Sequence, residues 1–312
     1  MPATPKKELT PSRAVLRTSA RAGAAATFAV ATLAGFAPAP GRAGAAPVRL
    51  SRSAGQTADR LTTAPSGSVE EHSIASKRYG RDRRVWVYTP PRYAAGYGPG
   101  YDLLVVLDGA VYLSDISLPA ILDSLLAGGK APPFVAVLID NGSSTARLDD
   151  LANHARFAAF LGEEVLEWVR RRWTVTHDPR RTIVVGSSAG GLAAAYVAFQ
   201  RPDLFGNVLS QSGAFWRGNE GSNDAPYEWL TSRYAASPRR DVRFLLEVGE
   251  LESRGAMGGA APSILESNRR FRDALRTRGY TVQYAEVPGG VHAPPSWRER
   301  LAPAIAALAA RK

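Results

Sequence analysis

The sequence predicts an α/β fold in which a mostly parallel central sheet is covered by helices on both faces. From residue 101 onward, short apolar strands alternate with helical segments, as in successive βαβ units. Strands such as Leu103–Leu107 and Phe134–Ile139 are apolar along their whole length, which indicates burial on both faces of the sheet. A third observation is Thr182–Leu192, where a β-branched strand passes through a glycine-rich turn directly into an Ala-rich helix.

The elements follow in order along the chain. Glu71–Ser76 and Arg84–Tyr88 flank the turn Tyr79–Asp82 and predict an N-terminal antiparallel hairpin, because the second strand alternates as Arg-Val-Trp-Val-Tyr. Further strands are expected at Leu103–Leu107, Phe134–Ile139, Thr182–Val185, Gly206–Gln211, Arg243–Val248 and Thr281–Val287. Helices are expected at Leu118–Leu126, Arg147–Trp173, Gly190–Phe199, Tyr227–Tyr234, Ile264–Gly279 and Ser296–Ala310. We expect no large cap domain.

The first 45 residues differ from the rest and predict an export signal. Basic residues between Lys6 and Arg21 precede a weakly apolar stretch, Ala22–Ala39, and the small residues Ala43–Ala45 suit cleavage. A disordered tail and an uncleaved anchor are the alternatives, but Gly and Pro break the apolar run, which is short for a membrane span. We therefore expect a periplasmic or secreted protein with no stable membrane span after leader cleavage. Residues 46–67 predict a flexible linker before a single folded domain, residues 68–312.

The formal net charge of +11 depends strongly on the leader. Residues 1–45 hold six of the 39 basic residues and one acid, so removing them lowers the formal charge to +6. The other basic residues are spread out, without a patch interleaved with aromatic residues, and do not indicate a nucleic-acid partner. A modestly basic surface favours an anionic substrate. The chain has no cysteine, which excludes disulfides, thiolate catalysis and cysteine-based metal sites.

Ser188 lies at the centre of Gly186-Ser187-Ser188-Ala189-Gly190, between the predicted strand and helix. Such a strand–turn–helix is typical of a nucleophile elbow, in which the serine hydroxyl is exposed on a strained turn. Glycines two residues before and after the serine let strand and helix nearly touch. An ordinary glycine-rich turn is the alternative interpretation.

The serine needs a base and an acid. In α/β hydrolases the chain order is serine, acid, histidine, and only His292 follows Ser188, on the loop after the last predicted strand. The acid should follow the strand Arg243–Val248, where Glu250 and Glu252 both occur. We favour Glu252, with Glu250 or a dyad lacking a strong acid left open. The other histidines are expected to be structural or exposed: His72, His154 and His177.

Two backbone N–H groups must stabilise the oxyanion. One belongs to Ala189, directly after the nucleophile. The second is expected from the loop Leu107–Tyr112, where a tight turn at Gly109 would aim the N–H of Ala110 at the site. A plain β-turn is the alternative for this loop.

Candidate substrate-binding residues lie on loops at the carboxyl ends of strands, where ligands bind in such sheets. Aromatic walls would suit an aryl acyl group, and a cation would suit an anionic substrate. Packing into the core, or an ion pair between Arg147 and Asp108 or Asp150, is the alternative. The candidates are Tyr112, Arg147, Phe215 and Trp216.

Several motifs together resemble the enterochelin esterase family of the esterase-D-like α/β hydrolases. They are Leu107-Asp108-Gly109, the elbow, Asp140…Arg147…Asp150-Leu151, Ser210–Trp216 and His292 with Trp297-Arg298. The resemblance covers about residue 70 to 312 and implies an α/β-hydrolase fold for the catalytic domain. It implies a serine esterase acting through an acyl-enzyme, with catecholate siderophores such as enterobactin as substrates and with neither cofactor nor metal. By motif matching, Ser188, Glu252 and His292 take the triad roles, and Ala110 and Ala189 the oxyanion roles.

The chain departs from the family at two places. Val291 separates His292 from the preceding glycines, and Ala293 stands where the family often has an acid. The short segment before the domain is similar to exported members rather than to cytoplasmic members with an N-terminal β-domain. Similar motifs occur in generic carboxylesterases and mycolyltransferases, so an acyltransferase is the alternative enzyme. A catalytically inactive siderophore-binding protein is the alternative outside enzymes, and the complete serine, acid and histidine set argues against it.

Overall fold

The strands form one eight-stranded sheet with the order β1-β2-β4-β3-β5-β6-β7-β8. The computed structural model describes residues 65–142, 144–152, 154–219 and 222–310. The predicted leader and residues 46–64 of the predicted linker lie outside the described residues. β2 pairs antiparallel with β1 and β4, whereas the strands from β4 through β3 to β8 pair parallel. The predicted α/β fold, mostly parallel with an N-terminal hairpin, is confirmed.

The elements have the following bounds. The strands are β1 Ser68–Ser76, β2 Arg81–Thr89, β3 Asp102–Val106, β4 Phe134–Ile139, β5 Thr182–Ser187, β6 Asn207–Gln211, β7 Arg243–Gly249 and β8 Thr281–Val287. The α-helices are α1 Gly109–Ser114, α2 Leu118–Ala127, α3 Ser144–Leu151, α4 Ala155–Ala159, α5 Leu166–Arg170, α6 Ala189–Gln200, α7 Trp229–Ala236, α8 Ile264–Thr277 and α9 Pro294–Ala309. A π-helical turn, η1 Phe160–Val165, joins α4 to α5, and short 3₁₀ turns are η2 Pro179–Arg181 and η4 Met257–Gly259.

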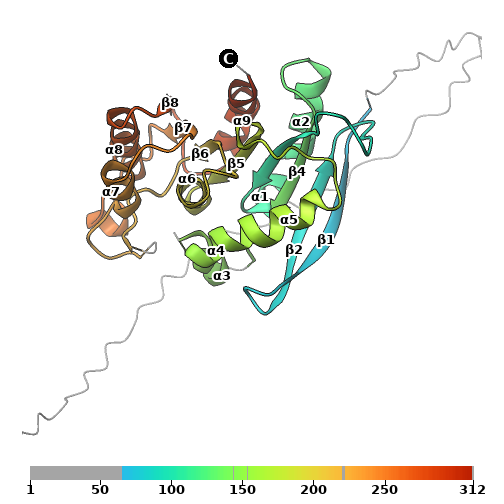
Figure 1. The fold of residues 1–312 in the computed structure, drawn as a ribbon. Coiled ribbons are helices and arrows are strands. Elements are labelled where there is room, and N and C mark those ends of the chain that lie inside the picture. The colour runs from blue at the N-terminus through green and yellow to red at the C-terminus, as the bar shows by residue number, and fades with distance from the viewer. Residues whose placement is uncertain (1–64, 143, 153, 220–221, 311–312) are drawn as a thin grey trace, which may run out of the picture. The chain divides into compact units, whose positions relative to one another are not determined.

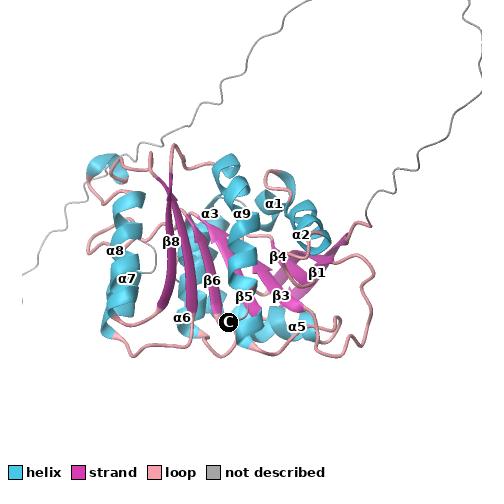
Figure 2. Cartoon of the chain, turned by 90° about the horizontal axis from the view of Figure 1, so that it is seen from above, coloured by secondary structure: helices cyan, strands magenta, loops and turns pink. Residues whose placement is uncertain are grey.

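Helices cover both faces of this sheet (Figures 1 and 2). Helices α1, α2 and α9 contribute to the apolar core on one face, and α4 to α8 contribute to the core on the other. Strand residues alternate between the two cores: Leu103 and Val105 enter one, Leu104 and Val106 the other. This arrangement explains why Leu103–Val106 of β3 and the whole of β4 are apolar at every position.

The helical region predicted as Arg147–Trp173 is interrupted, which corrects that prediction. Helix α3 ends at Leu151 and α4 begins at Ala155, although the sequence between them contains neither Gly nor Pro. Within the second part, Gly162 of η1 packs against the end of α6, since a Cβ there would lie 2.7 Å from Nη1 of Arg201. Among the described residues, no helix is long and apolar enough to cross a bilayer.

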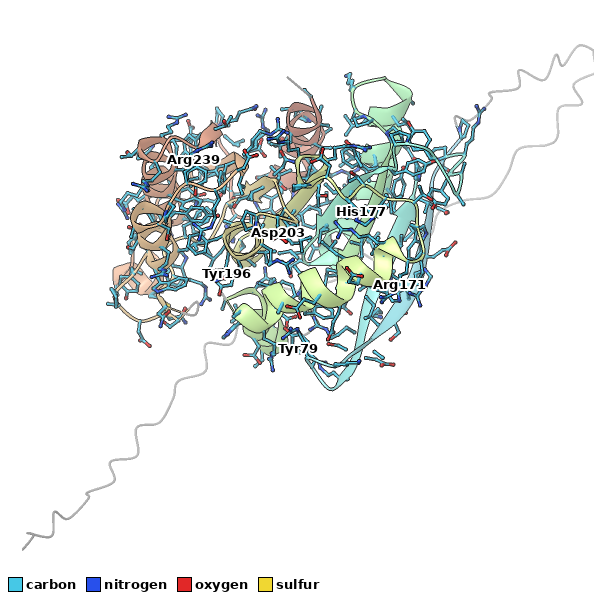
Figure 3. The ribbon with its side chains drawn as sticks, in the orientation of Figure 1. Tyr79, Arg171, His177, Tyr196, Asp203 and Arg239 are labelled. Carbon is cyan, nitrogen blue, oxygen red and sulfur yellow. The ribbon has the colours of Figure 1, made fainter. Side chains whose placement is uncertain are left out.

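The N-terminal hairpin is held to the helical layer beneath it by an aromatic and ionic contact. Tyr79, which is labelled in Figure 3, lies in the β1–β2 turn. Its ring packs edge-on against Phe160, with ring centroids 5.4 Å apart. The guanidinium of Arg83 lies 4.3 Å from the Tyr79 ring and forms a buried ion pair with Asp150 at 2.6 Å. Burial raises the pKa of Tyr79 to about 12. This contact connects the hairpin to α3, and through α3 to the loops beside Ser188.

Candidate active site

Ser188 occupies the turn between β5 and α6 in a strained backbone conformation, with φ 57° and ψ −121°. Its N–H donates to the carbonyl of Gln211 at 2.9 Å, and its own carbonyl accepts from the N–H of Ala214 at 2.9 Å. Strand and helix cross so closely that a Cβ on Gly186 would lie 2.3 Å from the carbonyl carbon and oxygen of Gly190. The neighbouring strand end and the glycines thus hold the serine in a conformation that it would not adopt alone.

His292 bridges Ser188 and Glu252. Its Nε2 lies 2.9 Å from Oγ of Ser188, and its Nδ1 lies 2.5 Å from Oε2 of Glu252. The three side chains come from the turn after β5 and the loops after β7 and β8, so all lie at the carboxyl edge of the sheet. The Glu252 side chain is 2% exposed and that of His292 is 37% exposed. The carboxylate is therefore shielded from water, while the imidazole remains accessible to a ligand.

The two candidate acids lie in different environments. Oε1 of Glu252 accepts from the N–H of Gly249 at 2.8 Å and from Oγ–H of Ser212 at 2.6 Å. Glu250 is exposed, and its backbone N–H donates to the carbonyl of Val287 at 3.1 Å. One carboxylate thus contacts the imidazole, and the other faces solvent.

The remaining histidines do not contact Ser188. His72 lies edge-on to the rings of Trp168 and Trp173, with centroids 5.3 and 5.2 Å away. His154 precedes α4 as its N-cap residue, and His177 is exposed in the loop before η2 (Figure 3). Within the described ranges, His292 is the one imidazole that is hydrogen-bonded to the serine.

Ala110 and Ala189 lie in the first turns of α1 and α6. Backbone N–H groups at the start of a helix have no partner within it, and neither of these two donates to another described residue. The two helix starts adjoin, since a Cβ on Gly190 would lie 3.0 Å from Oδ2 of Asp108. The turn predicted at Gly109 is in fact the start of α1, packed so closely on β4 that a Cβ would lie 2.9 Å from the carbonyl carbon of Leu138.

Arg147 pairs with Asp108, which directly precedes α1. Its Nε and Nη2 donate to the two carboxylate oxygens at 2.6 and 2.7 Å, a bidentate geometry. The N–H of Asp108 donates to Asn141, whose side-chain amide donates to Asp150. Burial raises the pKa of Asp108, and the Arg147 guanidinium opposes that shift. Of the two roles expected for Arg147, the structure shows the ion pair with Asp108, through which its guanidinium holds the loop that carries Ala110.

The predicted aromatic wall lies mostly inside the protein. Tyr112 is fully buried under the sheet edge, with its hydroxyl 3.2 Å from Oε1 of Gln211, and burial raises its pKa. Phe215 is also fully buried and stacks on Phe271 with centroids 3.9 Å apart. The substrate roles predicted for Tyr112 and Phe215 are therefore wrong, because Tyr112 belongs to α1 and packs into the apolar core, and Phe215 packs against Phe271 of α8. Trp216 keeps 8% of its surface exposed.

Two features of the site were missed by reasoning from the sequence. Ser212 and Trp297 are hydrogen-bonded to each other beside Glu252, although both occur in the motifs that carry the family resemblance. Leu251 and Val291 are exposed apolar residues flanking the acid and the base, and the N–H of Leu251 donates to the carbonyl of Gly290 at 3.1 Å.

Burial lowers the pKa of Arg217, and the nearby Arg147 guanidinium adds to that shift.

Comparison with known sequences gives a family and named relatives. The Esterase family ("Putative esterase") matches residues 76–308. The iron(III) enterobactin esterase of Escherichia coli (strain K12) is 30% identical over 235 residues, which span 75% of this chain and 56% of that protein. The protein of the same name from Dickeya dadantii (strain 3937) is 31% identical over 268 residues, or 81% of this chain and 58% of the relative. The chain thus spans a little over half the length of these relatives.

Comparison with solved structures agrees with the sequence comparison. The enterobactin esterase of Shigella flexneri, crystallised in the presence of enterobactin, aligns with a TM-score of 0.68 and 29% sequence identity. The alignment covers 78% of this chain and 60% of that one. The family match contains Ser188, Glu252 and His292 as well as both helix starts beside them. The chain therefore belongs to the Esterase family and is similar in sequence and in fold to enterobactin esterases.

Proposed function

We propose that this chain is a serine esterase that cleaves carboxylic esters through an acyl-enzyme, and that its substrates are catecholate siderophores of the enterobactin type. The observation that carries the chemistry is the hydrogen-bond chain from Ser188 through His292 to Glu252, with distances of 2.9 and 2.5 Å. The named relatives, which are iron(III) enterobactin esterases, support the substrate class.

Acylation begins when Oγ of Ser188 attacks the ester carbonyl carbon and Nε2 of His292 accepts the hydroxyl proton. Glu252 accepts a hydrogen bond from Nδ1–H, which keeps Nε2 free to accept that proton and stabilises the imidazolium. The N–H groups of Ala189 and Ala110 donate to the oxyanion that forms on the carbonyl oxygen. The bond between the carbonyl carbon and the alcohol oxygen then breaks, and the alcohol leaves with the proton from His292.

Deacylation repeats these steps with water as the nucleophile. His292 accepts a proton from water, the oxygen attacks the acyl carbon, and the proton returns to Oγ as Ser188 leaves. The exposed face of the imidazole supports this step, because a water molecule can reach Nε2 after the alcohol has departed. An alcohol in place of water would make the same site an acyltransferase.

Charge supports an anionic ligand. An iron(III) complex of catecholate groups carries negative charge, and residues 46–312 have a formal charge of +6 after removal of the leader segment. Near the site, the guanidinium groups of Arg147 and Arg217 lie close enough to influence each other. The side chain of Arg147 remains 28% exposed beyond its contact with Asp108. The leader composition of residues 1–45 supports the further proposal that the protein is exported.

The test is hydrolysis by the wild type and by Ser188→Ala of iron(III) enterobactin, the metal-free siderophore and p-nitrophenyl acetate, with products identified by mass spectrometry. Ser210→Ala is the matched control, because Ser210 is a buried serine at the neighbouring strand end and its hydroxyl has no hydrogen bond to the triad. We expect Ser188→Ala to lose activity by at least about 10³-fold on every substrate cleaved, with Ser210→Ala unchanged. Retained activity in Ser188→Ala would reject the esterase mechanism.

The same panel separates the competing functions. Cleavage of simple esters but of neither siderophore would indicate a generic carboxylesterase. Preferential formation of a new ester when a sugar alcohol is added would indicate an acyltransferase. Tight binding of the iron(III) siderophore, without cleavage and without labelling by a fluorophosphonate, would indicate a binding protein.

A further inference from the structure

Ser212 has a conformation and a set of partners that the triad chemistry alone does not require. It directly follows β6, is 2% exposed and has φ 51°, a left-handed conformation uncommon for a residue with a side chain. Its N–H donates to the carbonyl of Glu247 on β7 at 2.6 Å, which fixes the backbone in place. Strained residues of this kind concentrate at functional sites, so the direction of the Ser212 side chain is informative.

The Ser212 hydroxyl lies between Trp297 and Glu252. Its Oγ accepts a hydrogen bond from Nε1–H of Trp297 at 3.0 Å and donates its own proton to Oε1 of Glu252 at 2.6 Å. Because an indole nitrogen can only donate, the direction of the whole chain of hydrogen bonds is fixed. The proton of Ser212 therefore points to the carboxylate.

The two oxygens of Glu252 consequently have different partners. Oε1 accepts from both Ser212 and the backbone N–H of Gly249, whereas Oε2 lies 2.5 Å from Nδ1 of His292. Hydrogen bonds to a carboxylate stabilise its charged form and lower its affinity for a proton. The donors on Oε1 thus set both the orientation of the carboxylate and the strength with which Oε2 holds Nδ1–H.

Trp297 couples this arrangement to the base. It lies in the first turn of α9, and its ring meets that of His292 edge-on at 90°, with centroids 5.3 Å apart. Its backbone carbonyl accepts from Nε2 of Gln211 at 2.8 Å, which ties the start of α9 to the end of β6. A single side chain therefore contacts the base directly and the acid through Ser212.

We infer that Ser212 and Trp297 are positioning residues, which orient Glu252 and tune its basicity toward His292. They act through a relay of two hydrogen bonds: Nε1–H of Trp297 donates to Oγ of Ser212, and Oγ–H of Ser212 donates to Oε1 of Glu252. This inference rests on the proposed function, because it assigns these residues an effect on the same hydrolytic site. Neither residue needs to touch the substrate.

The relay makes a prediction that a purely structural role does not. In Ser212→Ala, Oε1 keeps one donor, so the carboxylate becomes more basic and the imidazolium is held more strongly. The carboxylate also loses one of the two donors that orient it toward Nδ1 of His292, so we expect kcat to fall by about 10- to 100-fold, the range for losing one hydrogen bond to a charged group. The acidic limb of the pH profile of kcat/KM should also shift to higher pH. Trp297→Phe, which removes the indole N–H and keeps a ring beside His292, should produce smaller changes in the same directions.

The experiment compares pH profiles for p-nitrophenyl acetate among wild type, Ser212→Ala, Trp297→Phe, the double variant and the control Ser210→Ala. If Trp297 acts through Ser212, adding Trp297→Phe to Ser212→Ala changes the position of the acidic limb no further. Ser212→Gly removes the same hydroxyl but relieves the positive φ, so it should be at least as stable as Ser212→Ala and equally slow.

The inference is overturned if Ser212→Ala and Ser212→Gly keep the kcat and the pH profile of Ser210→Ala. Should Ser212→Ala fail to fold, the unshifted profile of Trp297→Phe would overturn it instead. Failure of the proposed function gives a different result, namely activity that survives Ser188→Ala.

Discussion

Replacing Glu252 by glutamine tests the assignment of the triad acid, because it exchanges one carboxylate oxygen for an NH₂ group. Glutamine has nearly the same shape, but it presents one oxygen and one NH₂ group where Glu252 presents two acceptors. At the Oε1 position the backbone N–H of Gly249 is a donor that cannot turn away, 2.8 Å from the oxygen. The amide oxygen must therefore face Gly249, and the NH₂ group must face Nδ1 of His292.

That orientation gives the imidazole the wrong tautomer. A donor opposite Nδ1 requires this nitrogen to be unprotonated, so the proton moves to Nε2, which lies 2.9 Å from Oγ of Ser188. The histidine then donates to the serine and cannot accept its proton. An amide in place of a triad carboxylate lowers kcat by about 10⁴-fold, which corresponds to roughly 5.5 kcal/mol of transition-state stabilisation.

The assay is steady-state hydrolysis of p-nitrophenyl acetate at pH 7 to 8, with the melting temperature as a check on folding. Glu250→Gln is the matched control, because Glu250 lies two residues away and faces solvent, so its kcat should equal that of the wild type. The reasoning is refuted if Glu252→Gln keeps more than about a tenth of the wild-type kcat, or if Glu250→Gln loses as much activity.

Three further results are expected. Gly186→Ala places a methyl group 2.3 Å from the backbone of Gly190, so the free energy of unfolding, measured by chemical denaturation, should fall by about 3 kcal/mol. An unchanged value would contradict the close crossing of β5 and α6. The two hydrogen bonds from Arg269 hold the pKa of Glu286 at about 2, below its ordinary value, so the pair stabilises the fold above about pH 4.3 and ceases to do so as the pH falls toward 2. Glu286→Gln should thus cost about 1 kcal/mol at pH 7, a difference that shrinks at pH 3, whereas a pH-independent difference would argue against the pair. For export, fractionation of cells expressing the full chain should place the processed protein outside the cytoplasm, and an unprocessed cytoplasmic chain would oppose that proposal.

The strands and the triad candidates could be predicted because they depend on local sequence patterns or on the order of residues along the chain. Strand segments that are buried on both faces of a parallel sheet are apolar at successive positions, as Leu103–Val106 of β3 and the whole of β4 are. The elbow needs glycines at fixed places around Ser188, and only His292 follows it in the sequence. The sequence favours Glu252 but leaves Glu250 open, because both lie within the same loop, and their side-chain directions in the structure separate them.

The remaining errors have a common physical cause. Tyr112 and Phe215 follow strands at the edge where ligands bind, but their exposure depends on the helices formed there: Tyr112 belongs to α1, and Phe215 packs against α8. Helix α1 is only six residues long, too short to show apolar periodicity, so the sequence indicated a turn. Arg147 could meet a substrate or an acid, and its partner Asp108, 39 positions away in the chain, was one of two carboxylates open to it. Long-range pairing of this kind is not encoded in local pattern.

Identification of the residue that becomes covalently modified tests the central claim most directly. Full-length protein is treated with a fluorophosphonate, digested and mapped by mass spectrometry, alongside Ser188→Ala and the control Ser210→Ala. We predict one adduct, on Ser188, which is present in Ser210→Ala and absent in Ser188→Ala. An adduct on another residue, or no adduct on a protein that hydrolyses esters, would contradict the account.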